Sequence, residues 1–261
     1  MSTLKPQLAS QLASQLASQL ATQLASQLEP TPLKPVVLAI TGASGAVYGA
    51  RLLQILLEQA VPTHLTISDS GAAVIAQELG VRLALEKVDA AAMMRASNTF
   101  LKQAEVNFDE LVEKSKSSGL LTVHHYKNYF TPIASGSFLT AGMVICPCSG
   151  STMSGVAHAA SQNLIQRAAD VHLKEHRKLI LVPRETPLSV FQLENMYRLA
   201  QAGAVILPAM PGWYHGVHDM LDLVDFVVAR ILDQLGVPHT LMQRWKSEGS
   251  SEVNDLTNTQ E

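Results

Sequence analysis

Residues 36–49 read VVLAITGASGAVYG, and this stretch decides the fold class. The run from Val36 to Thr41 is mostly apolar, which is typical of a strand buried on both faces of a sheet. The glycine-rich turn Gly42–Gly45 then leads into a segment from Ala46 to about Gln59 whose apolar spacing predicts a helix. A buried strand, a tight turn and a helix in this order predict the first unit of a parallel α/β sheet.

The alternation of apolar runs and helical patterns continues along the chain. Further strands are predicted at 64–68, 143–146 (closed by Pro147), 178–182 and 204–207. Further helices are predicted at 71–79, from 151 onward, and at 163–176, 189–202 and 221–235. Residues 80–130 are polar and poorly patterned, and we expect helices and an excursion there. The whole pattern predicts an α/β fold with a doubly wound parallel sheet and helices on both faces.

The composition excludes several classes of protein. The chain has 261 residues, of which 47% are apolar and 16% charged, and its formal net charge is −3. This balance argues against a nucleic-acid partner, because such binding depends on a surplus of basic residues. No apolar stretch reaches the ~18–20 residues that a membrane span needs. The two cysteines are too few for a disulfide framework, which favours a reducing, cytoplasmic location.

The same residues offer no metal site. Cys146 and Cys148 stand one residue apart and lack a partner pair, so we expect buried, unreactive thiols. His124 and His125 lie in an irregular stretch without a third ligand at metal spacing, and we expect them to be surface or packing residues.

The N-terminus carries a repeat that the core does not share. Residues 7–30 contain six copies of a four-residue unit related to QLAS, and Pro30, Pro32 and Pro35 end any helix there. We expect residues 1–35 to be a low-complexity extension, disordered or transiently helical, with a self-associating helix as the alternative. The folded domain then covers residues 36–245, and residues 246–261 form a polar tail.

Small and polar residues follow the predicted strands. The turn after the first strand suits a phosphate, because its backbone is open and a helix starts there; a plain strand-to-helix turn is the alternative. Ser68 ends the second strand, and Ser149–Thr152 opens a helix after Pro147. Because ligands of such sheets bind at the carboxyl ends of the strands, we expect these residues to share one site.

Charged and aromatic residues continue this pattern. Arg184 and Glu185 stand between two prolines at a strand end, where a surface ion pair worth ~0–1 kcal/mol is the alternative. Trp213 and Tyr214 lie in a glycine- and proline-rich loop that could also pack on its own aromatics.

Three cations on predicted helices add to the site. Arg167 and Lys174 are seven residues apart, which places them on one helix face. Arg230 follows an apolar run, where an arginine with a buried stem at the surface is the alternative. Together with Arg184, these cations are expected to gather at one site that binds phosphates.

Seven motifs stand in the order and spacing of one enzyme family. They are TGASGA (41–46), SGS (135–137), PCS (147–149), RAAD (167–170), LKE (173–175), PRETP (183–187) and PGWYH (211–215). Through them, residues 36–245 resemble the UbiX-type flavin prenyltransferases. The resemblance implies a flavodoxin-like subunit that assembles into a homo-oligomer, a dodecamer.

The resemblance also implies an activity. Members of this family transfer a dimethylallyl group from dimethylallyl monophosphate to reduced FMN, with new bonds at the flavin N5 and C6, and they require no metal. The product, prenylated FMN, is the cofactor of UbiD-type decarboxylases. The alternatives are a flavin- or nicotinamide-dependent oxidoreductase, a flavin-dependent cysteine decarboxylase on a related sheet, and a flavin-binding scaffold without activity.

Carried over residue by residue, the resemblance implies three sets of site residues. The FMN-binding set is Gly42, Ala43, Ser44, Ser68, Ser149, Gly150, Ser151, Thr152 and Arg184. The set at the dimethylallyl phosphate is Tyr214, Arg230, Lys174, Trp213, Glu78 and, from a neighbouring subunit, Arg167. The catalytic set is Glu185 as the acid–base residue, with Ser44 sharing its proton and Lys174 at the phosphate. Trp213 would also stabilise an allyl cation.

Overall fold

The computed structural model describes residues 15–20 and 33–242. The chain divides into two units, Met1–Leu33 and Lys34–Glu261. In the first unit, residues 15–20 are helical and their side chains are exposed. The rest of the repeat and the polar tail 246–261 lie outside the described residues. The disorder predicted for the repeat therefore stays a prediction.

One parallel sheet organises the described part of the second unit. Its strands are β1 (Val36–Ile40), β2 (Thr63–Ile67), β3 (Leu121–His125), β4 (Gly142–Cys148), β5 (Leu179–Pro183) and β6 (Val205–Ile206). They lie in the order β3-β2-β1-β4-β5-β6, and each neighbouring pair is parallel. The direction of winding reverses between β1 and β4, and without the edge strand β3 the order is that of a flavodoxin-like sheet. The predicted doubly wound fold is therefore confirmed.

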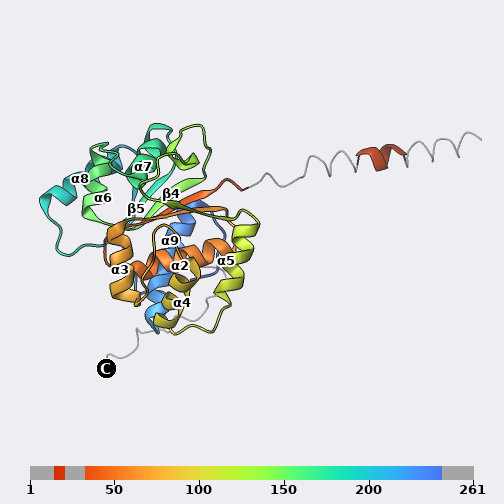
Figure 1. Ribbon diagram of the computed structural model, residues 1–261, viewed down its shortest axis with the longest axis horizontal. Coiled ribbons are helices and arrows are strands. Elements are labelled where there is room, and N and C mark those ends of the chain that lie inside the picture. Colours follow the sequence, from red (N-terminus) through yellow and green to blue (C-terminus); the bar gives the residue numbers. More distant parts are fainter. Residues whose placement is uncertain (1–14, 21–32, 243–261) are drawn as a thin grey trace, which may run out of the picture. The chain divides into compact units, whose positions relative to one another are not determined.

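Helices cover both faces of this sheet (Figure 1). One layer contains α2 (Ala46–Glu58), α3 (Asp69–Leu79), α4 (Ala90–Phe100), α5 (Phe108–Ser117) and α9 (Met220–Leu235). The other contains α6 (Gly150–Ala157), α7 (Leu164–Lys174) and α8 (Val190–Gln201), with the short 3-10 turn η1 (Pro132–Ala134) beside α7.

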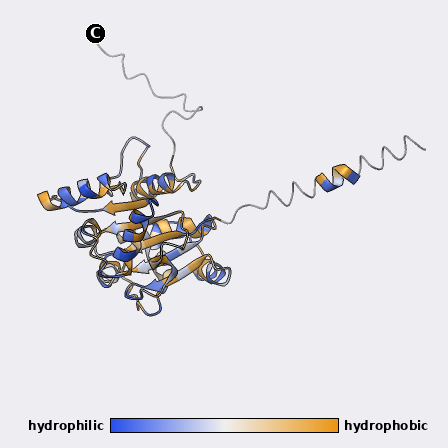
Figure 2. Cartoon of the chain, turned by 90° about the horizontal axis from the view of Figure 1, so that it is seen from above, coloured by the Kyte–Doolittle hydropathy of each residue, from blue (hydrophilic) through white to orange (hydrophobic). Residues whose placement is uncertain are grey.

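The strands supply the core to both layers. Leu38 and Ile40 of β1 face the layer of α2 and α9, whereas Val37 and Ala39 face the layer of α6 and α7. All five residues of β1 are buried, as its continuous apolar sequence predicts. In Figure 2 the hydrophobic colour runs along several strands inside the domain, whereas the helices mix the two colours.

Two features differ from the sequence-based expectation. Strand β4 does not end before Pro147 but continues through it to Cys148, and its register with β5 shifts between Ile145 and Cys148. Proline donates no hydrogen bond, but the Pro147 carbonyl still accepts one from the main-chain nitrogen of Thr41 at 3.2 Å. The polar segment 80–130 holds α4, α5 and the edge strand β3, and β3 was not predicted. The ring of His124, on β3, stacks on that of His64 with centroids 5.0 Å apart, so His124 is a packing residue, as expected.

Candidate active site

The carboxyl ends of β1, β2 and β4 are joined by hydrogen bonds. The Thr41 hydroxyl donates to the Pro147 carbonyl at 2.9 Å and accepts from the main-chain nitrogen of Ser149 at 2.8 Å. The main-chain nitrogen of Ser68 donates to the Ile40 carbonyl at 3.0 Å. These bonds bring the starts of α2, α3 and α6 together at the point where the strand order reverses, which is where open α/β sheets bind ligands.

The glycine-rich loop has a backbone that few other residues could adopt. Gly45 has a φ of 104°, in the left-handed region. Gly49, one turn into α2, lies so close to β4 that a Cβ there would stand 2.5 Å from the Cys146 carbonyl oxygen. The close packing of α2 on β4 fixes where the loop lies.

The N-terminus of α2 already holds an anion. The Glu78 carboxylate, at the end of α3, accepts from the main-chain nitrogens of Gly45 and Ala46, each at 2.9 Å. These two main-chain donors, which the sequence predicts to suit a phosphate, are bonded to Glu78 in this structure. Glu78 therefore lies beside the glycine loop.

Hydroxyl groups gather at the starts of the other two helices. The Ser68 side chain caps α3 by accepting from Gly71, and the Ser149 side chain caps α6 by accepting from Thr152. The Ser149 hydroxyl also lies 3.2 Å from that of Ser151. The predicted FMN-binding hydroxyls therefore lie at two helix N-termini, where the backbone favours negative or polar ligand groups.

Arg184, which follows β5, contacts the residues at the carboxyl end of β1. Its Nε donates to the Ser44 carbonyl at 3.3 Å, so the arginine lies over the glycine loop. A hollow of about 50 Å³ beside it is lined by Glu185, Thr186, Met196 and Met210, among others. The Glu185 side chain is exposed, and its carboxylate accepts from Gln192 at 3.5 Å.

Sequence reasoning missed two residues here. Tyr48, on α2, packs its ring against Gly45, and burial raises the pKa of its phenol while the nearby Arg184 opposes that shift. Gln192, on α8, has its carbonyl oxygen fixed by the main-chain nitrogen of Ser189 at 2.8 Å, so its amide points toward Glu185. The three-residue spacing of Ser189 and Gln192, a helix-capping pattern, is the signal that could have identified Gln192.

Tyr214 and Arg230 are both associated with α9. The Tyr214 ring packs edge-on against Phe226 of α9, and Arg230 lies one turn further along that helix, paired with Asp233 at 2.9 Å. The Trp213 and Tyr214 side chains are 71% and 58% exposed. Arg230 lines a cavity of about 270 Å³ between α9 and β6, and this cavity shares Pro208 and Met210 with the hollow beside Arg184.

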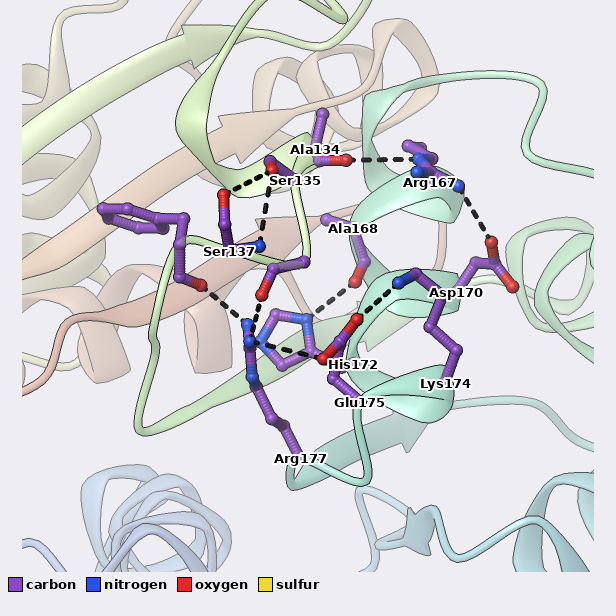
Figure 3. Close-up of polar contacts among 12 residues, drawn as sticks. Ala134, Ser135, Ser137, Arg167, Ala168, Asp170, His172, Lys174, Glu175 and Arg177 are labelled. Carbon is purple, nitrogen blue, oxygen red and sulfur yellow. Dashed lines mark hydrogen bonds and ion pairs between the residues drawn. The ribbon is translucent and has the colours of Figure 1, made fainter.

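Lys174 lies at the opposite edge of the sheet from the glycine loop. Helix α7 starts beside Tyr126, just past the carboxyl end of β3, and its last residue, Lys174, comes shortly before β5 begins. A five-residue strand spans roughly 17 Å at about 3.3 Å per residue. Lys174 therefore lies at the amino edge, where it pairs with Glu175 (Figure 3).

The other cations of that set are also dispersed. Arg167, on α7, donates to the Ala134 carbonyl at 3.2 Å and pairs with Asp170 (Figure 3). Helices α7 and α9 lie on opposite faces of the sheet. The expectation that Arg167, Lys174, Arg184 and Arg230 gather at one site is therefore not met within a single copy of the chain.

The described residues offer neither a metal site nor a membrane-spanning helix. Residues 15–20 and 33–242 contain no group of three or more His, Cys, Asp or Glu side chains that could hold a metal. Within the same ranges, no helix is both long and apolar enough to cross a membrane. Cys146 and Cys148 are unpaired and buried, and burial raises the pKa of both thiols, that of Cys148 to about 12.

Comparisons with known proteins show the family of this chain. The model of the Flavoprotein family matches residues 24–232. The flavin prenyltransferase UbiX of Alkalihalophilus pseudofirmus is 46% identical over 212 residues, which cover 81% of this chain and 96% of that protein. UbiX of Pseudomonas aeruginosa is 46% identical over 210 residues, 80% of this chain and 93% of that protein.

Solved structures are similar over the same region. A UbiX crystallised with FMN and dimethylallyl pyrophosphate is 32% identical, with a TM-score of 0.66 over 82% of this chain and 98% of that one. A dodecameric FMN-dependent UbiX-like decarboxylase from Escherichia coli is 36% identical, with a TM-score of 0.66 over 82% of this chain and 100% of that one. Since the similarity extends over nearly the full length of these proteins, the chain belongs to the UbiX family of flavin prenyltransferases.

Proposed function

We propose that this chain transfers a dimethylallyl group from dimethylallyl monophosphate to reduced FMN and so makes prenylated FMN. The observation that carries the proposal is the meeting of Gly42–Ser44, Ser68, Ser149–Thr152 and Arg184 at one edge of the sheet. Membership of the UbiX family supports the same activity.

The residues at this edge fit a flavin nucleotide. Small side chains in the glycine loop leave room for a planar ring beside the backbone, and two hydroxyl-capped helix starts with Arg184 suit its phosphate and ring carbonyls. When bound there, FMN supplies the electron-rich ring atoms N5 and C6 that accept the dimethylallyl group.

The chain's own residues supply the remaining chemistry. The allylic C–O bond breaks and the phosphate leaves with the electron pair, so cations such as Lys174 and Arg230 lower the barrier by stabilising that charge. Ring closure at C6 requires the removal of a proton, and we assign this to the exposed carboxylate of Glu185. Ser44, whose carbonyl accepts from Arg184, would share that proton. Trp213 would stabilise positive charge on the allyl group.

More than one copy of the chain completes the site. Lys174 lies at the far edge of the sheet from the FMN-binding residues, so it reaches a flavin only on a neighbouring copy, and Arg167 lies on the same helix. Apolar side chains that would otherwise be exposed offer a contact surface: Val190, Phe191, Leu193 and Tyr197 of α8 are each at least 50% exposed. The similar Escherichia coli protein is dodecameric, and we propose the same assembly here.

The partners follow from the reaction. The product would be handed to a UbiD-type decarboxylase, and the unpaired cysteines agree with a cytoplasmic location. The similar UbiX complex contains dimethylallyl pyrophosphate, so both the mono- and the diphosphate are to be tested as donors.

Mass spectrometry of the flavin tests the proposal. The protein is incubated without oxygen with reduced FMN and dimethylallyl mono- or diphosphate, and the flavin is weighed. The expected result is the gain of one five-carbon unit, and substitution of Glu185→Gln or Lys174→Ala strongly slows that gain. Nicotinamide oxidation with no gain in flavin mass would favour an oxidoreductase, and flavin binding with neither would favour a scaffold.

A further inference from the structure

The loop that carries the Ser135–Ser137 motif is held through its carbonyl groups by two arginines (Figure 3). Arg177, just after α7, donates from Nη1 to the Phe138 carbonyl at 2.6 Å and from Nη2 to the Gly136 carbonyl. Arg167 donates to the Ala134 carbonyl at 3.2 Å from the other side. The Arg177 side chain is only 13% exposed, so its guanidinium is committed to this loop.

The same loop touches the Lys174–Glu175 pair. A Cβ built on Gly136 would lie 2.9 Å from the Lys174 Nζ and closer still to the Glu175 carboxylate. One carboxylate oxygen of Glu175 forms an ion pair with Lys174, and the other lies 3.9 Å from Nη2 of Arg177. The bare backbone of Gly136, the Glu175 carboxylate and Arg177 therefore limit where the Lys174 ammonium can lie.

We propose that Arg177 is a positioning residue, which acts through Gly136 and Glu175 to direct Lys174 toward the phosphate of the prenyl donor. This inference rests on the proposed function, because it takes Lys174 as a phosphate ligand for a neighbouring copy. Arg177 itself binds no substrate in this role, since each of its two terminal nitrogens donates to a carbonyl oxygen of the loop.

The charges around Lys174 agree with this role. Contact with Lys174 and then the charge of Arg177 lower the pKa of Glu175, which keeps that carboxylate ionised. An ionised Glu175 holds the long lysine side chain in one direction until a phosphate, with its greater charge, takes its place as partner.

Titration calorimetry on the FMN-loaded protein tests the proposal. Dimethylallyl monophosphate is titrated into wild type and Arg177→Gln, and we expect the variant to bind it about tenfold more weakly, the scale of one charge-assisted hydrogen bond. FMN affinity and the mass of the assembly stay unchanged. Lys178→Gln is the matched control: it removes the neighbouring cation, whose Nζ donates to the Gln234 carbonyl of α9 at 2.6 Å.

A double-mutant cycle separates positioning from general stability. If Arg177 acts through Lys174, then Arg177→Gln adds no further loss of donor affinity in a Lys174→Ala background. Additive losses, or equal losses of FMN and donor affinity, would overturn the proposal.

Gly136→Ala decides the question if Arg177→Gln does not fold. The added methyl group meets only the flexible ends of Lys174 and Glu175, so the protein should keep its melting temperature while donor affinity falls. Unchanged donor affinity in Gly136→Ala would refute the role of this loop. A wild-type protein that forms no prenylated flavin would instead refute the proposed function, and one that forms it while the variants bind the donor normally would refute only the positioning role.

Discussion

The carboxylate of Glu78 lies 2.9 Å from the main-chain nitrogen of Gly45, so the last turn of α3 caps the start of α2. Helix starts have unsatisfied N–H groups, and this side chain satisfies those of Gly45 and Ala46 from another helix. The contact therefore holds the glycine loop in the shape that the proposed flavin site requires.

We predict that Glu78→Ala weakens both the fold and the flavin site. Two charge-assisted hydrogen bonds are lost, which should lower the free energy of unfolding by ~1–3 kcal/mol and raise the Kd for FMN. Urea unfolding and quenching of flavin fluorescence measure the two effects. Glu113→Ala, on the exposed side of α5, is the control and should change neither. Normal FMN affinity in Glu78→Ala would contradict this role of Glu78 in the loop.

A buried ion pair joins α2 to α9. Arg51 donates from Nε and Nη2 to both oxygens of Asp225, at 2.8 and 2.9 Å, and the two side chains are 9% and 8% exposed. Asp225→Asn leaves the arginine charge buried without its counter-ion, so we expect a loss of about 3–5 kcal/mol in unfolding free energy at fixed protein concentration.

Two comparisons test this explanation. Replacing both partners, Arg51→Met with Asp225→Leu, should restore much of the lost stability because no charge then stays unpaired. Asp109→Asn breaks the exposed pair with Arg95 and should cost only ~0–1 kcal/mol. Equal losses of unfolding free energy in Asp225→Asn and Asp109→Asn would show that burial of the ion pair does not cause the larger loss expected for Asp225→Asn.

The stacked His64 and His124 predict a loss of stability in acid. Burial, and then the charge of His124, lower the pKa of His64 from its ordinary 6.5 to about 4, and burial lowers that of His124 as well. Between pH 6.5 and 4 the unfolded chain binds a proton at His64 that the folded chain does not bind, so stability is lost as the pH falls through this window. Melting temperatures across that range measure the effect.

His64→Gln should lose less stability than wild type over the same pH range. Its amide can still donate to His124 but does not titrate. The exposed His158→Gln is the control and should follow the wild-type curve. A His64→Gln curve parallel to that of wild type would mean that other groups cause the acid sensitivity.

The two cysteines should be inert in the folded protein. Cys146 and Cys148 are 0% and 1% exposed, and burial raises the pKa of both thiols, so little thiolate is available to react. We expect no reaction with a thiol reagent at pH 8 and two equivalents after unfolding. An introduced surface thiol, Ser118→Cys, reports that the reagent is active. Fast labelling of the native wild type would contradict the burial of β4.

Local patterns predicted those parts of the fold that are themselves local. The run from Val36 and the turn at Gly42 identify a buried strand and a helix start because both signals lie within a few residues. Strand β3 escaped because it lies at the sheet edge, where only Leu121 of its five residues is buried, so no apolar run marks it. Strand β4 was predicted to end before Pro147 because proline has no N–H to donate. The Pro147 carbonyl can still accept a hydrogen bond, and the Thr41 hydroxyl donates to it.

For the site, too, the sequence predicted local features but not contacts between distant parts of the chain. Ser68, Ser149 and Arg184 meet because strand ends of a parallel sheet share an edge, and sequence order alone indicates that. The position of Lys174 could not be predicted, because a seven-residue spacing gives the face of a helix but not the sheet edge at which the helix ends. The contact of Glu78 with Gly45 could not be predicted, because it spans 33 positions and depends on how α3 packs beside α2.

The N-terminal repeat should be dispensable for prenyl transfer. The folded unit begins at Lys34, and in the described part of the repeat Leu16 and Leu20 are 55% and 53% exposed, so neither is needed to cover a core. The deletion should remove residues 1–33 and keep Pro35, whose carbonyl accepts from the main-chain nitrogen of Ala141 at 2.9 Å. We expect this truncated protein to prenylate FMN at the wild-type rate and to keep the mass of the wild-type assembly, measured by light scattering. A smaller assembly that still prenylates FMN would indicate that the repeat is a self-associating helix. A loss of prenyl transfer in an intact assembly would contradict the prediction that the repeat is dispensable for the reaction.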